Sequence, residues 1–412
     1  MGNLEGSRYD ALSRAELAAL VPELLLVGQL IDRSGMAWCI GALGREEMAR
    51  IAIDEWAAAS PIYTRRMQQA LRYEGDDVIT IFKGLQLDIG APPQFMDFRY
   101  TVHDRRNGEF HLDHCGALVD VEPMGPDYVR SMCHDIEDPT FDATAVATNP
   151  RAQVRPIHRP PRIPADRSPH CAWTVRIDDS HPPVQATELC LRNQVSRAAT
   201  LELAPIDPAD EGLADYSGPL LSDLDFSAFS RSALVRIADE VCLQMHLLTN
   251  GFRMALAARL PEKQARDIAV RTLVGIAGIA TERIRRAVVG AGPLDLICLH
   301  PLLNPAAYVE LSRSEEALRV HPGPAHEDGA WIALCGPSEL RPLQALVRAI
   351  DPLLGVEVTG SDQEWTLRLV EREAPAAEAD EVAVTRISTG AGFEFSPRRS
   401  LPLYPVSGSG AP

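Results

Sequence analysis

The stretch Leu12-Ser13-Arg14-Ala15-Glu16-Leu17 returns 217 residues later as Phe229-Ser230-Arg231-Ser232-Ala233-Leu234. The register of this repeat holds without a gap for about sixty residues, long enough to represent a whole structural unit. Further on, Trp173-Thr174-Val175-Arg176 matches Trp365-Thr366-Leu367-Arg368 at an offset of 192. Because the offset shrinks, the first copy carries additional residues before its last strand. The 412-residue chain is therefore predicted to be one unit written twice.

The beginning of each copy has helical periodicity. Leu17, Leu20 and Leu24 recur at helical spacing, and Ser13 with Glu16 forms a capping-box pattern. A second helix is predicted to begin near Arg45, and a third to run from residue 64 to 71. The sequence thus predicts a helical bundle at the start of each copy.

The second part of each copy reads as strands. Residues 95–103 and 109–114 flank an Asn-Gly turn signal, which predicts a β-hairpin. Residues 153–158 and 171–177 are further predicted strands, and residues 126–133 a short helix. The expected fold class is α+β, a tandem duplication of a helical bundle followed by a small antiparallel sheet.

The repeat also sets the expected domain boundaries. We expect a first copy over residues 1–180, a linker over 181–228, a second and degenerate copy over 229–372, and an acidic, flexible tail over 373–412. Such a chain resembles a homodimer fused into one polypeptide. The predicted state is a monomeric pseudo-dimer or a homodimer.

The amino-acid composition limits the classes of partner that the protein is expected to bind. The 40 Lys and Arg residues against 57 Asp and Glu give a net charge of −17, which disfavours nucleic acid and anionic membranes. The N-terminal residues lack a signal-peptide pattern, and the longest apolar run, residues 17–31, is interrupted by polar residues. We therefore expect a cytoplasmic protein whose partner is a small-molecule substrate or ligand, with no membrane contact.

Histidine and cysteine are concentrated in the first copy. Seven of the 11 histidines lie between His103 and His181, together with three of the eight cysteines. Four segments each supply a Cys or His, as a zinc site requires. Ordinary buried thiols with surface imidazoles, or a metal-free Cys/His catalytic site, would give the same pattern. The candidate ligands of a divalent metal, zinc above all, are His103, His114, Cys115, Cys133, His134, His158, His170 and Cys171.

The same region carries a family resemblance. Its motifs, in chain order, are Phe98-Arg99-Tyr100, Cys133-His134, Asn149-Pro150-Arg151, His158-Arg159-Pro160-Pro161 and His170-Cys171-Ala172-Trp173. Residues 12–178 resemble a family of small cytosolic proteins related to the L-2-amino-thiazoline-4-carboxylic acid hydrolases. The family positions that match are Cys133, His158 and Cys171, while His103 and Arg159 stand where the family has cysteines.

The resemblance implies a hydrolase acting on a C–N or C=N bond of a small polar or heterocyclic substrate, with its site in the first copy only. A metal would activate water, and a nearby carboxylate would move the proton. Asp135 and Glu137 are the candidates for that carboxylate. Alternatively, both are solvated residues in an acidic turn.

Other side chains are candidates for substrate binding. Arg155, Arg159 and Arg162 could pair with a substrate carboxylate. Trp38 and Trp56 lie where the second copy has small or aliphatic residues, which indicates either core packing or a cavity unique to the first copy. A second functional hypothesis stays open, namely a non-catalytic small-ligand binding or sensor protein with a structural zinc or a redox Cys/His cluster.

Overall fold

The computed structural model describes residues 2–3, 6–386 and 400–403, and it has the predicted α+β architecture. The elements of the first copy, in order, are α1 (Arg14–Leu43), α2 (Arg45–Ala70), α3 (Val78–Leu85), β2 (Met96–Val102), β3 (Asn107–Cys115), α4 (Gly116–Val121), η2 (Glu122–Met124), α5 (Pro126–Arg130), the π-helix η3 (Ser131–Ile136), α6 (Glu137–Val146), β4 (Ala152–His158), β5 (Cys171–Ile177) and α7 (Glu188–Asn193).

The second copy repeats this order in shorter form. Its elements are α9 (Arg231–Ala257), α10 (Glu262–Ala287), α11 (Pro293–Cys298), η5 (Pro301–Leu303), β6 (Leu311–Arg313), β7 (Ala317–Val320), α12 (Pro324–Asp328), η6 (Trp331–Leu334), α13 (Arg341–Ile350), β8 (Leu354–Ser361), β9 (Glu364–Glu371) and α14 (Asp380–Arg386). The remaining elements are β1 (Gly2–Asn3), η1 (Arg8–Ala11), α8 (Arg197–Thr200) and η4 (Phe226–Ala228).

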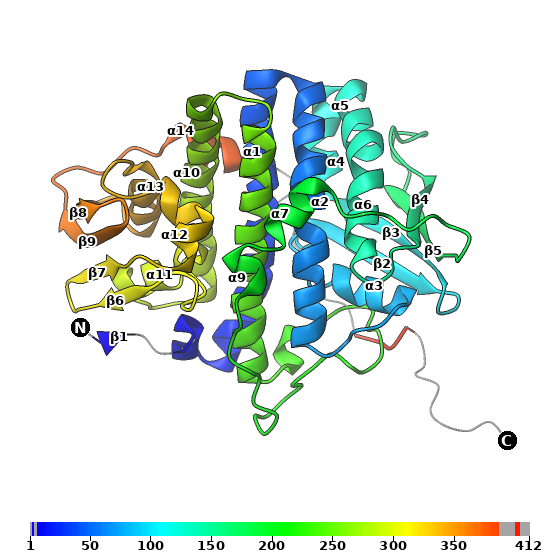
Figure 1. The fold of residues 1–412 in the computed structure, drawn as a ribbon, viewed down its shortest axis with the longest axis horizontal. Helices are drawn as coiled ribbons and strands as arrows, with labels where there is room; N and C mark the ends of the chain where they lie inside the picture. The colour runs from blue at the N-terminus through cyan, green and yellow to red at the C-terminus, as the bar shows by residue number, and fades with distance from the viewer. Residues whose placement is uncertain (1, 4–5, 387–399, 404–412) are drawn as a thin grey trace.

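Four long helices form the centre of the molecule. Helices α9 and α10 begin 217 residues after α1 and α2, as the sequence repeat predicts. Each copy's first helix packs along the second helix of the other copy, α1 on α10 and α9 on α2, while α1 and α9 also pack together (Figure 1). The two copies thus share one hydrophobic core, which is the arrangement of a two-fold dimer.

Contacts between the copies are reciprocal. Arg14 Nε donates to Phe229 O at 2.7 Å, and its counterpart Arg231 Nε donates to Leu12 O at 2.9 Å. Two ion pairs repeat this relation. Arg66 Nε lies 2.9 Å from Glu240 Oε2, and Arg283 Nη1 lies 3.3 Å from Glu23 Oε2. In each case two residues from different copies are in contact, and their counterparts make the reverse contact. Such reciprocal contacts are typical of an isologous interface.

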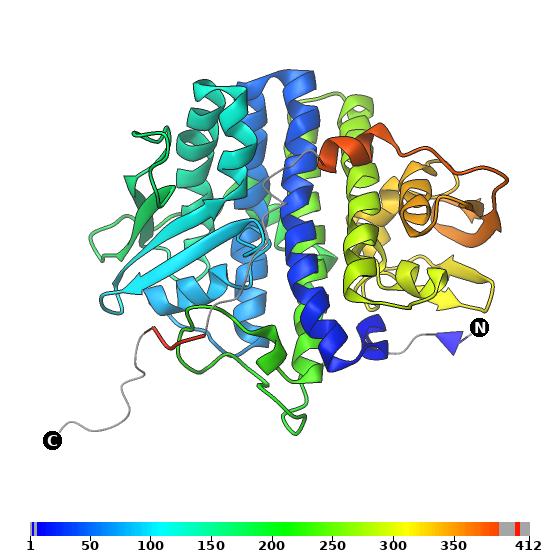
Figure 2. The same cartoon turned by 180° about the vertical axis from the view of Figure 1, so that it is seen from behind.

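The two antiparallel sheets have the same strand order. The first is β2-β3-β5-β4, and the second is β6-β7-β9-β8 with the short β1 added at its edge. Phe110 pairs with Trp173 in the first, as Val320 pairs with Trp365 in the second. The sheets lie on opposite sides of the bundle, the first beyond α2 and the second beyond α10 (Figures 1 and 2).

Several predicted boundaries need correction. The third helix predicted over residues 64–71 is the last part of α2, which continues through Pro61. The hairpin turn falls at residues 103–106, because Asp104 Oδ1 accepts hydrogen bonds from the backbone N–H groups of Arg106 and Asn107.

The predicted linker and tail contain structure that belongs to the copies. Helix α7 packs on α2 and α9, and α14 packs on α10 and α1, so both are the closing helix of a copy. The expected flexible tail therefore contains an ordered helix. Its remainder beyond residue 386 lies outside the described residues, except for residues 400–403.

A helix that spans a membrane must be both long and apolar. None of the described helices combines enough residues with enough apolar character to cross a bilayer.

Candidate functional site

The three cysteines of the predicted cluster lie near one another in the first copy. Cys115 caps α4, Cys133 lies on the π-helix and Cys171 begins β5, and all three are buried. Burial raises the pKa of Cys115 to about 12 and also raises the pKa values of Cys133 and Cys171, with the Glu137 carboxyl adding to each effect. Burial therefore favours the neutral thiol form of all three side chains.

The predicted histidine ligands do not join these cysteines at one point. His103 forms an exposed pair with Glu109, at 3.0 Å, near the tip of the hairpin. His134 Nε2 lies 2.7 Å from Pro160 O, while the ring of His114 lies 6.2 Å from that of His170.

The fifth candidate, His158, is partly buried at the end of β4, near His111 and Arg167. Within residues 2–3, 6–386 and 400–403, no three His, Cys, Asp or Glu side chains come together so as to hold a metal ion. The predicted ligand set does not fit a zinc site in this arrangement.

The three candidate substrate arginines are all engaged in ion pairs. Arg155 Nη1 lies 2.8 Å from Asp142 Oδ2, and Arg159 Nη1 lies 2.5 Å from Asp138 Oδ1. Both carboxylates belong to α6. Arg162 binds Glu122 of η2 through two hydrogen bonds. The arginines thus fasten β4 and the following loop to the neighbouring helices.

The two candidate carboxylates lie in different environments. The predicted acidic turn is helical, formed by the π-helix and the start of α6, and residues two apart on a helix point to different sides. Asp135 is exposed to solvent, whereas Glu137 is buried. Single π-helical turns within helices are frequent at functional sites.

The two candidate tryptophans also lie in different environments. Trp38 packs at the boundary between α1 and α10, where the Arg271 guanidinium lies 4.9 Å from its ring centroid. Trp56 instead faces a cavity in the first copy, and so does Glu137. The structure therefore brings together two of the predicted site residues.

This cavity has a volume of about 70 Å³ and lies between α1, α2, α6, the π-helix and the loop after α3. Its polar lining is unusually charged for a protein interior. The residues that line it are Gln29, Asp32, Arg33, Trp56, Leu85, Asp88, Gly90, Ala91, Met96, Ala117, Met132, Ile136, Glu137, Thr140, Phe141 and Thr144. We refer to it as the first-copy cavity.

One wall of the first-copy cavity is an ordered ion pair. Asp32 Oδ2 accepts hydrogen bonds from Arg33 Nε at 3.0 Å and Nη2 at 2.7 Å. Its other oxygen, Oδ1, accepts a 3.1 Å hydrogen bond from Trp56 Nε1. Both oxygens are thereby engaged, which fixes the indole and the guanidinium in place.

A second wall is the loop that carries Asp88. Its Oδ1 accepts hydrogen bonds from Tyr63 OH and Gly90 N, both at 2.7 Å. Burial raises the pKa of Asp88 to about 6, and these two hydrogen bonds oppose the rise. The loop lies so close to α1 that a Cβ on Gly28 would be 2.4 Å from Ile89.

Glu137 is the least satisfied group in the cavity. Its side chain is buried, and Oε2 has no hydrogen-bond partner among the described residues. Burial raises the pKa of Glu137 to about 8, although the Arg159 guanidinium lowers it. Glu137 and Asp88 therefore change protonation on either side of neutral pH, a property typical of acid–base sites.

Another unpartnered carboxyl lies behind this cavity. Both carboxyl oxygens of Glu55 are buried without a hydrogen-bond partner among residues that the structure describes. Burial, and then the nearby Asp32, raise the pKa of Glu55 well above its ordinary value. Glu55 is not among the lining residues, so it is a buried carboxyl behind Asp32.

The equivalent place in the second copy has different side chains. Asp32 and Arg33 have Thr249 and Asn250 as counterparts, and Gln29 has His246. The ring of His246 packs edge-on against Tyr308 and Trp331, at centroid distances of 4.7 and 5.4 Å. These rings are buried and replace the charged lining by an aromatic cluster.

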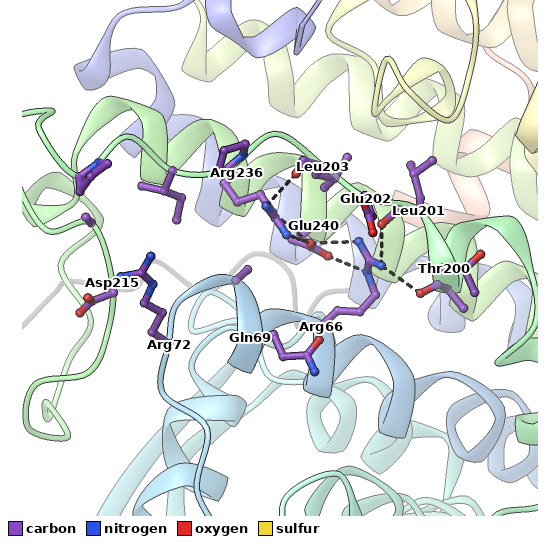
Figure 3. A pocket seen from close by; sticks show the side chains of 16 residues that line it. Arg66, Gln69, Arg72, Thr200, Leu201, Glu202, Leu203, Asp215, Arg236 and Glu240 are labelled. Atoms are coloured by element: carbon purple, nitrogen blue, oxygen red, sulfur yellow. Dashed lines mark hydrogen bonds and ion pairs between the residues drawn. The ribbon is translucent and has the colours of Figure 1, made fainter.

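A larger pocket of about 520 Å³ lies between the end of α2, the segment after α8 and α9 (Figure 3). Arg66 and Arg236 both bind Glu240, and they also bind backbone carbonyls of residues 199–204. These side chains hold the connection between the copies in place, so they are not available to a ligand.

Comparisons with family models, with curated proteins and with solved structures find no match for this chain. Function is accordingly inferred from the side chains themselves. Sequence reasoning missed Asp32, Arg33 and Asp88. For Asp32 and Arg33 the available signal was the repeat register, in which they correspond to Thr249 and Asn250.

Proposed function

We propose that the chain is a hydrolase of a small polar molecule with a C–N or C=N bond, and that the first-copy cavity is its only active site. The observation that carries the proposal is the pair of buried carboxyls, Asp88 and Glu137, whose pKa values of about 6 and about 8 bracket neutral pH. The type of bond follows from the family resemblance of residues 12–178.

The two carboxyls have complementary roles near pH 7. Asp88 is mostly ionised and accepts a proton from the attacking water, whereas Glu137 is mostly protonated and donates to the departing nitrogen. After product release, Asp88 loses its proton to solvent and Glu137 regains one from solvent. Arg33 is held by Asp32 and supplies a fixed positive charge beside the developing oxyanion.

The predicted metal is no part of this scheme, since the Cys and His candidates do not converge. Elemental analysis of protein purified without chelator tests that prediction directly. About one zinc per chain, lost in Cys133→Ala, would restore the metal-dependent version.

The proposal is tested by screening small amides, amidines and cyclic C=N compounds for release of ammonia or amine. Glu137→Gln is expected to lower the rate by about 10²- to 10⁴-fold, the usual contribution of general acid–base catalysis. Asp135→Asn is expected to keep the wild-type rate, because that side chain is exposed. Equal rates in wild type and Glu137→Gln would contradict the proposal, and binding without turnover would favour a ligand-binding protein.

A further inference from the structure

We propose that the first-copy cavity selects a small organic cation, an ammonium or guanidinium group, held between the carboxyls of Asp88 and Glu137. This inference rests on the proposed function, since it names the charge of that site's substrate. It follows from the balance of charges in the cavity, from an unpartnered buried oxygen, and from the cavity's size.

The charges that line the cavity do not cancel. Three carboxyls, those of Asp32, Asp88 and Glu137, face a single guanidinium, that of Arg33. Arg33 is already neutralised by Asp32, which it contacts through Nε and Nη2. Asp88 has no cation of its own in the described lining. Among the described residues, the only cation that acts on Glu137 is the Arg159 guanidinium, which lies outside the lining and is paired with Asp138. A buried carboxylate without a positive partner is unfavourable.

Two carboxyl groups are also short of hydrogen-bond donors. Glu137 is only 8% exposed, and its Oε2 has no partner among the described residues. Both hydrogen bonds to Asp88, from Tyr63 and Gly90, end on Oδ1, so Oδ2 can take a further donor. A ligand with several N–H groups would satisfy both carboxyls at once.

Size and aromatic lining agree with this ligand. A volume of about 70 Å³ is equivalent to roughly two water molecules at about 30 Å³ each, which suits a group of a few heavy atoms. Trp56 and Phe141 contribute aromatic rings to the same lining. Aromatic faces attract cations, most strongly when water is excluded.

A pair of isosteric probes tests the role of charge. Methylguanidinium chloride and methylurea have nearly the same shape, but only the first is a cation. Each is titrated at millimolar concentration into the full chain at constant ionic strength, and binding is followed through the ligand methyl signal by NMR. Methylguanidinium is expected to bind at least tenfold more tightly, which corresponds to about 1.4 kcal/mol.

Isosteric variants locate the binding site. Asp88→Asn and Glu137→Gln are expected to remove the preference for the cation, whereas Glu282→Gln on the outer face of α10 is expected to retain it. Circular dichroism confirms that each variant is folded. Equal binding of the two probes, or a preference that survives both cavity variants, overturns the proposal.

The test does not depend on turnover. Cation binding without any hydrolysis would contradict the proposed function and leave the cation site standing. Hydrolysis of neutral substrates without selective binding of methylguanidinium would do the reverse.

Discussion

The two copies have the same order of helices and strands, but they differ in the side chains that occupy one position on their first helix. In the first copy, Gln29, Asp32 and Arg33 of α1 line a cavity with Glu137 of α6. In the second copy, His246 of α9 packs against the rings of Tyr308 and Trp331. A packed aromatic cluster stabilises, whereas a charged cavity does so only with a ligand or at a suitable pH.

The residues around this position also differ between the two copies. Gly28 of α1 allows the Asp88 loop to approach, and its counterpart in α9 is Met245. Helix α6 begins with Glu137, while the corresponding helix α13 begins with Arg341, which pairs with Glu339 on the surface. Glu137 therefore has no carboxyl counterpart at the start of α13.

The largest expected effect comes from the ion pairs that relate the copies. Glu240 is 2% exposed and binds both Arg66 and Arg236, whereas its counterpart Glu23 is 20% exposed and binds Arg283. Glu240→Ala should lower the free energy of unfolding in urea by about 3–5 kcal/mol, because it leaves buried charge uncompensated. Glu23→Ala should lower it by about 1 kcal/mol or less. Equal losses would contradict the assigned asymmetry.

A pH-dependent effect comes next. Because the pKa of Glu137 is raised in the folded state, its contribution to stability is complete below pH 4.5 and is lost as the pH rises to about 8. Glu137→Gln should thus gain stability relative to wild type across this window, by up to about 1.4 kcal/mol per pH unit. Urea unfolding at pH 5 and at pH 8 measures the gain. A constant difference between wild type and variant would contradict the raised pKa.

A smaller effect is expected at the loop that closes the cavity. Gly28→Ala places a methyl group against Ile89 and should lower the free energy of unfolding by about 1–3 kcal/mol, the usual range for overpacking. Gly41→Ala on the same helix is the control, because a Cβ there would meet nothing within 4 Å. If both variants unfold at the same urea concentration, the loop does not lie against α1 as described.

The smallest effect is expected for an arginine that the sequence suggested for substrate binding. Arg155 and Asp142 form a partly exposed pair, so Arg155→Ala should change stability by less than about 1 kcal/mol. It should also leave binding of methylguanidinium to the first-copy cavity unchanged. Loss of binding in this variant would indicate that Arg155 is part of the binding site.

The sequence predicted the scaffold better than the site. The repeat register predicts where α9 and α10 begin, and the period-2 patterns predict β4 and β5 within one residue. The density of Cys and His around residues 103–181 led to the prediction of a metal site. Within residues 2–3, 6–386 and 400–403, no three His, Cys, Asp or Glu side chains come together to hold an ion, and the metal stays a prediction. Asp32, Asp88 and Glu137 are far apart in the chain and meet only through packing of α1, α6 and the loop after α3.

The central claim, that the first-copy cavity holds a buried acid that titrates near neutral pH, is tested most directly by the carboxyl of Glu137. Infrared difference spectra between wild type and Glu137→Gln isolate its C=O band at each pH. The account predicts a protonated carboxyl at pH 7 that ionises at about pH 8. A Glu137 carboxyl already ionised at pH 5 would contradict it.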